Sequence, residues 1–465
     1  MKKSLSLIPF VALIALISTC VSVFGTDALD GATQVSLLIA SAVCVAVGYV
    51  MRRVEWDALE REMTASVASC MPSIIILLLI GAIGGTWMVS GIVPTMIYYG
   101  VQVLRPEWFL VSSSLFCALI SVMVGSSWTT VATVGVALMG IGRAHGIADG
   151  WVAGSIITGA YFGDKLSPLS DTTVLASSVS GTPLFTHIRY MMRTTIPTFG
   201  VSLAIFTVAG LTMDVAGSGE MTFLDQLRHT FTISPWLLVV PVLTGVMIAR
   251  RWPAMVVLFV AAMMAATVAV VCQPRLLSTV ADGWYEAIMK VIYGPTSLRT
   301  GNDALDALVR TSGMAGMMPT VWLIICAQVF GGVVTATGVL RDVMQMVLRA
   351  VRGRTSLVAT TAATGIFCNV ALADQFLSII LTCSIFKEAY RERGYESRLL
   401  SRTCEDGATV TSVLVPWNTC GLVQSTVLGV ATLAYLPYCF FNYLSPVTSV
   451  VVAALARKAG AGRHS

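Results

Sequence analysis

The sequence has few charged residues for its length and no polar half that stands apart from an apolar one. Asp, Glu, Lys and Arg make up 11% of the 465 residues, 56% are hydrophobic, and the mean hydropathy is +0.82. The charges sit in short clusters between apolar runs that repeatedly reach the ~20 residues needed to cross a bilayer. A soluble globular protein is therefore excluded, and we predict a polytopic membrane protein.

Motifs for disulfides, metal cofactors and nucleotides are also missing. The eleven cysteines contain no Cys-x-x-Cys pair, and we interpret them as small core residues. No two histidines stand at metal-ligand spacing, and no Gly-rich loop ends in Lys-Ser/Thr to hold a phosphate. We expect no metal or nucleotide cofactor and no enzymatic activity. The net charge of +5 does not indicate a nucleic-acid partner, because the arginines flank apolar segments as topology signals do.

The apolar segments predict an all-α fold with about 10–12 transmembrane helices. Single spans are predicted at 5–25, 33–51, 72–90, 187–212, 234–249, 253–272, 319–337 and 432–456, and interrupted spans at 149–183 and 398–431. Two further apolar stretches, 107–141 and 356–386, fit either re-entrant hairpins or single tilted crossings. Residues 54–70 are predicted to form an interfacial helix. The first run is expected to be an uncleaved span, because it is long and Ser18-Thr19-Cys20 is a poor signal-peptidase site.

An internal repeat is visible at a fixed offset of 247 positions (319 − 72 = 247). It relates Pro72, Gly84, Gly85 and Gly91 to Pro319, Gly331, Gly332 and Gly338, Leu110-Val111 to Leu357-Val358, Ser127 to Asp374, and Asp171-Thr172 to Asn418-Thr419. A constant offset over ~100 residues indicates two related halves. We therefore divide the chain into two N-terminal helices (1–53), a first repeat (54–233), linking helices with an external loop (234–312), and a second repeat (313–465).

Basic residues beside the spans predict the orientation of the chain in the membrane. Under the positive-inside rule both termini are cytoplasmic, on the basis of Lys2, Lys3, Arg52, Arg53, Arg250, Arg251, Arg349, Arg352, Arg354, Arg457 and Lys458. The first repeat then enters its span at Pro72 from the cytoplasm and the second enters at Pro319 from outside, so the repeats are predicted to be inverted. Inverted repeats with broken helices are typical of secondary transporters.

Five acidic residues fall within or at the mouth of the embedded segments: Asp164, Asp171, Asp374, Glu405 and Asp406. A bare charge at the bilayer centre costs about 3 kcal/mol, so these groups must be paired, protonated or bound to an ion. Lys165 adjoins Asp164, and Arg402 stands three and four residues before Glu405 and Asp406, a spacing that brings side chains together on one helix face. Because burial penalises a charged carboxylate, such a group holds either a proton or a cation. Competition of this kind is antiport.

Oxygen-bearing side chains gather at four predicted helix breaks, near 125–128, 163–173, 369–375 and 405–419. Pro168 lacks an amide donor and predicts one of these breaks. Since hard cations prefer oxygen ligands, we predict a cation site from Asp164, Asp171, Asp374, Ser127, Thr129, Thr172, Asn369, Asn418 and Thr419. Proton or charge coupling is assigned to Asp164, Asp171, Asp374, Glu405, Asp406, Lys165 and Arg402. A structural alternative stays open, because hydroxyls often bond their own helix and Lys165 and Arg402 can simply neutralise acids.

Five motifs carry a resemblance to a known family: Gly125-Ser-Ser-Trp-Thr129, the segment 159–173, Asn369 with Ala373-Asp-Gln375, Leu400-Ser-Arg402 with Glu405-Asp406, and Pro416-Trp-Asn-Thr-Cys-Gly421. With them the sequence resembles the NhaC family of Na⁺/H⁺ antiporters over most of its length. The resemblance implies export of Na⁺, or of Li⁺, coupled to proton entry across the inner membrane of the cell. Some family members instead exchange organic acids such as malate and lactate.

Other functions stay open at this point. A Na⁺/H⁺-coupled organic-anion exchanger would use Lys165 or Arg402 to hold a carboxylate, and an amino-acid transporter of the same family or a passive channel also fits the composition. A remote alternative is an intramembrane aspartyl protease, suggested by Tyr161-Phe-Gly-Asp164 with a second aspartate. The sequence is also compatible with a homodimer.

Overall fold

The computed structural model describes residues 5–24, 31–52, 54–213, 220–250, 252–296, 311–348, 351 and 353–461. Every named element in these ranges is helical, and an isolated β-bridge joins Thr296 to Thr311. Eight described helices are long and apolar enough to cross a membrane, and the number reaches ten if each of two bent helix pairs forms one span. The predicted all-α polytopic membrane fold is confirmed.

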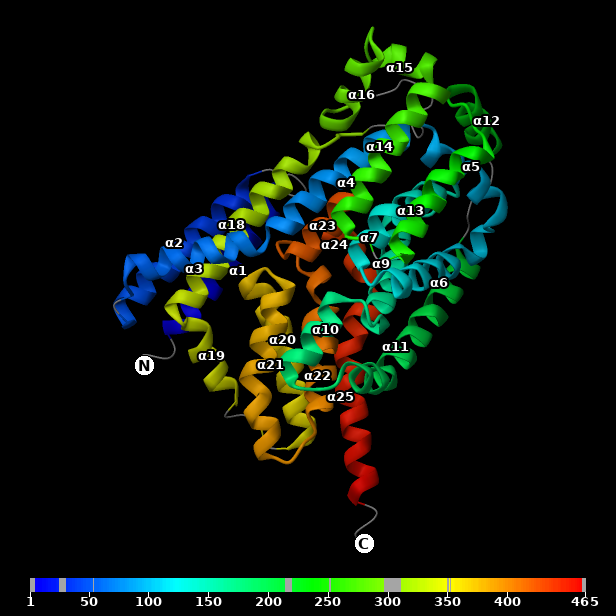
Figure 1. The fold of residues 1–465 in the computed structure, drawn as a ribbon. Helices are drawn as coiled ribbons and strands as arrows, with labels where there is room; N and C mark the ends of the chain where they lie inside the picture. Colours follow the sequence, from blue (N-terminus) through cyan, green and yellow to red (C-terminus); the bar gives the residue numbers. More distant parts are fainter. Residues whose placement is uncertain are drawn as a thin grey trace.

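Three groups of helices follow one another along the chain (Figure 1). The first comprises η1 (Leu5–Leu7), α1 (Ile8–Phe24), α2 (Ala32–Arg52), α3 (Trp56–Ser69), α4 (Met71–Val89), α5 (Ile92–Val103), α6 (Pro106–Val124), α7 (Ser127–Thr130), the π-helix η3 (Val131–Gly135), α8 (Val136–Ala144), α9 (Asp149–Leu166), α10 (Asp171–Ser180) and α11 (Leu184–Thr212). The connecting group comprises α12 (Glu220–Thr230), η5 (Pro235–Leu238), α13 (Val239–Ala249), α14 (Ala254–Cys272), α15 (Pro274–Val280) and α16 (Trp284–Tyr293). The last comprises η6 (Ala315–Met317), α18 (Met318–Thr337), α19 (Val339–Leu348), α20 (Arg354–Leu372), α21 (Gln375–Glu392), α22 (Ser397–Cys404), the π-helix η7 (Glu405–Thr409), η8 (Ser412–Leu414), α23 (Thr419–Leu428), α24 (Thr432–Tyr435), η9 (Leu436–Tyr438) and α25 (Phe440–Ala461).

Two segments differ from the simplest interpretation of the sequence. Residues 54–70 are not a separate interfacial helix, because α3 continues into α4 as one helical run, Trp56–Val89, and packs against α18. Gly332 permits this contact, since a Cβ there would lie 2.7 Å from the Met63 Cα. The stretch 356–386 folds back on itself, with α20 and α21 packed side by side (Figure 1), so it is a helical hairpin rather than one tilted crossing.

Equivalent helices of the two halves begin and end in register. Helix α4 begins at Met71 and α18 at Met318, which is the predicted offset of 247. From α6 onward the offset is 248, because the left-handed residues that follow α6 and α20 are Gly125 and Ala373. The pairs predicted at 247 in this region are therefore wrong by one residue. Ser126, not Ser127, is equivalent to Asp374, and Ser170, not Asp171, is equivalent to Asn418.

The same close helix contact occurs in both halves. Helix α9 crosses α6 at Gly159, where an added Cβ would collide with the Ser114 carbonyl. In the second half, η7 packs on α20 at Gly407 in the same way. A Cβ at Gly407 would lie 2.7 Å from the Ala362 Cα, so the two backbones are in close contact there. Both pairs are related by 248 positions (407 − 159 = 248; 362 − 114 = 248). The two halves thus share a packing arrangement as well as a pattern of glycines.

The orientation in the membrane stays a prediction. Lys2, Lys3, Arg53, Arg251, Arg349 and Arg352 lie outside the described residues, as do the side chains of Arg52, Arg457 and Lys458. Figure 1 places α15 and α16 at the opposite end of the molecule from the last turns of α25. This arrangement agrees with an external position for residues 273–296, the described part of the predicted external loop, if the end of α25 is cytoplasmic.

Candidate functional site

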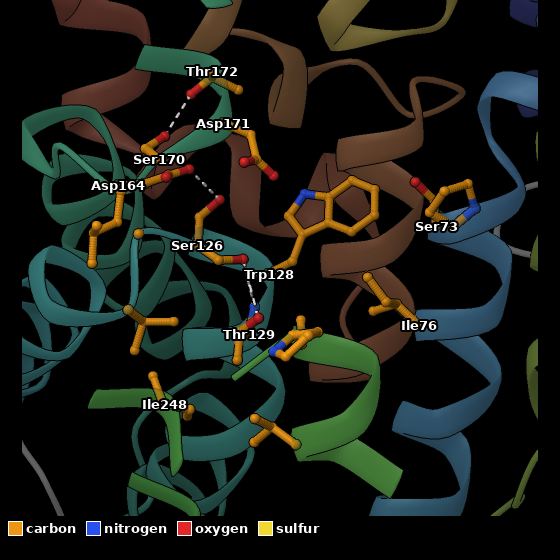
Figure 2. Close-up of a pocket in the computed structure, with 18 of the residues that line it drawn as sticks. Ser73, Ile76, Ser126, Trp128, Thr129, Asp164, Ser170, Asp171, Thr172 and Ile248 are labelled. Carbon is orange, nitrogen blue, oxygen red and sulfur yellow. Dashed lines mark hydrogen bonds between the residues drawn. The ribbon is translucent and has the colours of Figure 1, made fainter. Parts of the chain in front are cut away.

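A cavity of about 630 Å³ lies beside the two helix breaks of the first half. Its wall is formed by the start of α4, the break between α6 and α7, the break between α9 and α10, and parts of α13, α14 and α21. Five predicted site residues line it: Ser127, together with Thr129, Asp164, Asp171 and Thr172, which are labelled in Figure 2. The volume is large enough for a cation that keeps several water molecules.

Asp164 is the buried acid of this cavity. It lies in the last turn of α9 and is 6% exposed. The Ser127 hydroxyl donates a hydrogen bond of 2.9 Å to Asp164 Oδ2. Ser127 reaches this position because Gly125 adopts a left-handed conformation, with φ of 69°, and turns the chain at the end of α6. Because a carboxylate has about four acceptor positions, Asp164 keeps acceptor capacity for a ligand in the cavity.

The hydroxyls on the cavity wall also organise the helix starts. Ser126 caps α7, with its Oγ accepting hydrogen bonds from the Thr129 amide at 3.2 Å and from the Thr129 hydroxyl at 3.1 Å. At the start of α10 the Ser170 and Thr172 hydroxyls are 2.9 Å apart (Figure 2). Ser126 Oγ uses both of its lone pairs for the two hydrogen bonds from Thr129, whereas the Thr129 and Thr172 oxygens each keep a lone pair that can accept from water or contact a cation. Thr129 and Thr172 are thus both structural residues and available cavity oxygens.

Asp171 lines the cavity but is exposed, which corrects the prediction of a buried acid. It is the first residue of α10, directly after the break that contains Pro168. Figure 2 shows its carboxylate and the Trp128 indole pointing into the same space. Because the break opens the wall here, Asp171 stays in contact with the open cavity and carries its charge at a smaller desolvation cost than Asp164 does.

Asp374 is buried, yet it lies outside the cavity lining. Its Oδ1 accepts a hydrogen bond of 2.8 Å from the Leu377 amide, so it caps α21. Its equivalent, Ser126, has the same capping role in the first half. Thr419 lies beside Asp374, and its amide donates to the Ala373 carbonyl at 2.9 Å. These two predicted ligands are close to each other but are not brought to Asp164.

Asn369 and Asn418 hold the backbone of the second pair of breaks together. Asn369 Nδ2 donates to the Ala408 carbonyl at 2.6 Å and to Thr411 Oγ1 at 3.0 Å. Asn418 Nδ2 donates to the Asn369 carbonyl at 3.1 Å, and its Oδ1 caps α23 by accepting from the Cys420 amide at 3.0 Å. Both residues lie outside the cavity lining, and their amide nitrogens satisfy groups that the breaks leave open, so their role as cation ligands stays a prediction.

A buried ion cluster joins the two halves behind the cavity. Lys165 forms an ion pair with Asp406, both side chains being fully buried. Arg402 Nε lies 3.7 Å from Asp406 Oδ2, and the Thr194 hydroxyl donates to the same oxygen at 3.1 Å. Lys165 therefore has Asp406, not Asp164, as its ion-pair partner. Sequence reasoning missed Thr194, since nothing in the local pattern of α11 marks it.

Beside the cavity, farther along α4, lies a second cavity of about 340 Å³. Ile76 lines the first cavity and Ile80 the second, so one helical turn, about 6 Å, separates their linings on this helix. On the opposite wall Thr129 belongs to the first cavity and Ala132 to the second. Sequence reasoning missed this cavity, although Gly84, whose side-chain position opens onto free space, is part of the repeated glycine pattern.

Comparison with known proteins gives a consistent result. A sequence model described as the Na⁺/H⁺ antiporter family matches residues 159–456. The Na⁺/H⁺ antiporter NhaC of Alkalihalophilus pseudofirmus is 37% identical over 417 residues, covering 89% of each chain. The malate-2H⁺/Na⁺-lactate antiporter of Bacillus subtilis is 33% identical over 88% of this chain and 86% of its own. The arginine/ornithine antiporter ArcD of Halobacterium salinarum is 32% identical over 96% and 90%.

These relatives span nearly the whole chain, and the family match includes Asp164, the ion cluster and the second pair of helix breaks. The fold in turn supplies the apolar spans and interrupted helices of a multi-pass membrane protein. The chain belongs to the Na⁺/H⁺ antiporter family.

Proposed function

We propose that the protein is a secondary antiporter that exports cytoplasmic Na⁺ in exchange for external H⁺. The observation that carries the proposal is Asp164, a buried carboxylate that lines a cavity of about 630 Å³ and accepts a hydrogen bond from Ser127. A buried carboxylate of this kind needs a compensating positive charge, either a cation in the cavity or a proton in the same charge cluster, because the low-dielectric surroundings penalise an uncompensated charge. The proton gradient drives the exchange, and no nucleotide or metal cofactor takes part.

The cation binds at Asp164 with oxygen ligands from the same wall. Asp164, Ser127 and Thr129 supply a carboxylate and two hydroxyls, and water fills the remaining positions of a hard cation. Asp171, exposed in the same cavity, attracts the cation before it reaches Asp164. Asp374 and Thr419 form the corresponding helix start of the second half and stay candidates for a later step of transport.

The two cavities fit a path that crosses the membrane. They lie in succession along α4 and along the segment from α7 to α8. With both termini cytoplasmic and the two halves inverted, each cavity faces one side of the inner membrane, and a rearrangement of the intervening turn transfers the cation. This accounts for the repeated architecture, since inverted halves provide two conformations of similar energy.

Transport in proteoliposomes tests the proposal. When Na⁺ flows out of liposomes that contain the purified protein, the lumen should become more acidic, and when Na⁺ flows in it should become more alkaline. Asp164→Asn should abolish both pH changes. Glu388→Gln is a control, because Glu388 is an exposed acid paired with Arg391 and lines neither cavity. A Na⁺ current without any pH change would show a channel instead. Cleavage of a membrane peptide that is lost in Asp164→Asn would show an intramembrane protease instead.

A second candidate function is exchange of a cationic amino acid. The cavity holds two acidic side chains and has no Lys or Arg among its lining residues in the part of the chain described. Its volume exceeds the needs of a bare Na⁺ ion, and the relative from Halobacterium salinarum is named an arginine/ornithine antiporter. Exchange driven by arginine or ornithine in Na⁺-free liposomes would establish this candidate.

Organic-anion exchange has less structural support. That function needs a cationic group on the cavity wall, but Lys165 and Arg402 are fully buried beside Asp406 and are absent from the lining. Malate and lactate are therefore expected to leave the Na⁺-dependent pH signal unchanged in the same liposomes. A response to either acid would bring the chain closer to its malate/lactate relative.

A further inference from the structure

We propose that the proton exchanged for the cation is carried by Glu405, a carboxyl distinct from the cavity carboxylate Asp164. This rests on the antiport function proposed above and adds the place where the proton is held. It separates the two ions physically, in contrast to competition at a single carboxylate.

Glu405 is a buried acid without hydrogen bonds. It begins the π-helical turn η7, is fully buried, and neither of its carboxyl oxygens has a hydrogen-bond partner. Asp164, Asp374 and Asp406 each accept at least one hydrogen bond. The buried Thr409 hydroxyl lies on the same turn beside the Glu405 carboxyl and has no other hydrogen-bond partner.

This environment suits a neutral carboxyl. An ionised carboxylate buried without hydrogen bonds costs several kcal/mol or more, whereas the protonated group costs far less and can donate its own O–H. Thr409 offers an acceptor for that proton on the same helical turn. In the conformation described here, Glu405 therefore holds a proton.

The charges around Glu405 balance with one monovalent cation. The helices packed around this turn and at the end of α9 bring these ionisable groups together: Asp164, Lys165, His187, Cys368, Cys383, Tyr390, Arg402, Cys404 and Asp406. Thiols and phenols are neutral near pH 7. His187, whose Nδ1 is 2.8 Å from the Ser401 hydroxyl, is counted as a neutral imidazole. Two cations, Lys165 and Arg402, then face three carboxyls. One H⁺ on Glu405 or one Na⁺ at Asp164 makes the cluster neutral.

The two ion sites fall in different halves of the molecule. At the offset of 248, Glu405 and Asp406 are equivalent to Ile157 and Thr158, which lie in the regular α-helix α9. The second half has an acidic π-turn where the first half has an apolar helical turn, and π-turns often occur at functional sites. The first half thus supplies the cation site and the second half the proton site, with the Lys165–Asp406 pair between them.

Proton release on Na⁺ binding tests the assignment. Purified protein in weakly buffered detergent solution should release about one proton per Na⁺ bound, as followed with a pH dye, while ²²Na⁺ binding is measured in parallel. Glu405→Gln, which mimics the protonated side chain, should bind Na⁺ more weakly, because the cluster is already neutral, and should release no proton when Na⁺ binds. Asp164→Asn should lose both. Glu388→Gln, an exposed acid paired with Arg391 on α21, should retain both.

The outcomes separate this proposal from the antiport proposal. If Glu405→Gln binds Na⁺ and releases a proton as the unmodified protein does, the proton is not on Glu405, although antiport stands. If the unmodified protein neither binds nor exchanges Na⁺, the antiport proposal itself fails. Glu405→Asp guards against a folding artefact, since it retains a titratable group and should restore proton release with a shifted pH midpoint.

Discussion

Lys165 and Asp406 are 241 positions apart in the sequence and form a fully buried ion pair. Lys165 lies in the last turn of α9 and Asp406 in η7, so the pair links the first half to the second. Asp164, the residue before Lys165, faces the cavity. A change in charge at Asp164 therefore changes the electrostatic potential at the ion pair that joins the two halves.

Removing one partner of this pair is expected to destabilise the protein strongly. Lys165→Met leaves Asp406 buried with only Arg402 and Thr194 nearby, and loss of one member of a buried pair costs about 3–5 kcal/mol. The double variant Lys165→Met/Asp406→Leu should recover most of that loss. Thermal unfolding in detergent measures both. Lys290→Met, which breaks the exposed pair with Glu286, is the control and should change little. Equal effects of the two single variants would contradict the role of burial.

Removing the Ser127 hydroxyl is expected to weaken Na⁺ binding. Ser127→Ala deletes the 2.9 Å hydrogen bond to Asp164, and a hydrogen bond to a charged group contributes about 1.5–3 kcal/mol, so the Na⁺ concentration for half-maximal transport should rise about tenfold or more. Ser155→Ala is a matched control, because its hydroxyl bonds the Val152 carbonyl within α9, away from the cavity. An unchanged half-saturation in Ser127→Ala would exclude this residue from the cation site.

Filling the second cavity is expected to stop transport without removing Na⁺ binding. A Cβ at Gly84 meets no atom within 4 Å, so the side chain of Gly84→Leu projects into the cavity of about 340 Å³. Liposome exchange should fall sharply while ²²Na⁺ binding at Asp164 persists. Gly200→Leu, on the exposed side of α11 and equally unhindered, should transport normally. Normal exchange by Gly84→Leu would show that the cation does not pass this cavity.

The glycine contacts predict a contrast between two Gly→Ala substitutions. Gly407→Ala places a Cβ 2.7 Å from the Ala362 Cα, which forces backbone apart and should lower the unfolding temperature clearly. Gly200→Ala has free space and should stabilise helix α11 by up to about 1 kcal/mol, because alanine favours helix more than glycine does. Unfolding temperatures that move in the same direction would refute the close packing of η7 on α20.

Two substitutions of Asp374 separate its capping role from a transport role. Asparagine caps helices as well as aspartate, so Asp374→Asn should keep normal stability, whereas Asp374→Ala should cost about 1 kcal/mol. Transport by Asp374→Asn then reports on the charge alone. Exchange close to that of the unmodified protein would restrict Asp374 to capping, and loss of exchange at normal stability would return it to the ion path.

Local signals in the sequence predicted much of the fold. The helix that contains Asp164 ends at Leu166, just before Pro168, and the chain turns at Gly125, because proline and glycine act through their own backbone. The 247-residue offset was correct only up to Gly91 and Gly338, since one residue is inserted between there and α6, and matching residue types cannot locate a single insertion in an apolar segment.

Contacts between distant residues were the part that the sequence could not predict. Lys165 has a neighbouring acid in Asp164 but pairs with Asp406, because the folded arrangement of the two halves places the η7 carboxylate at the Lys165 ammonium group. Asp171 was expected to be buried, yet its exposure depends on the cavity rather than on its apolar flanks. Likewise, Asn369 and Asn418 bond backbone carbonyls whose positions depend on the complete set of breaks.

The helix starts at the breaks have a consequence for release of the ion. Helix α10 begins at Asp171 on the cavity wall, and helices α21 and α23 begin at the buried residues Gln375 and Thr419. The N-terminal end of a helix carries about half a positive charge. These partial charges stabilise nearby carboxylates when the site is empty, and the start of α10 also opposes a cation in the cavity. The same helix starts that stabilise the empty site therefore favour release of the ion.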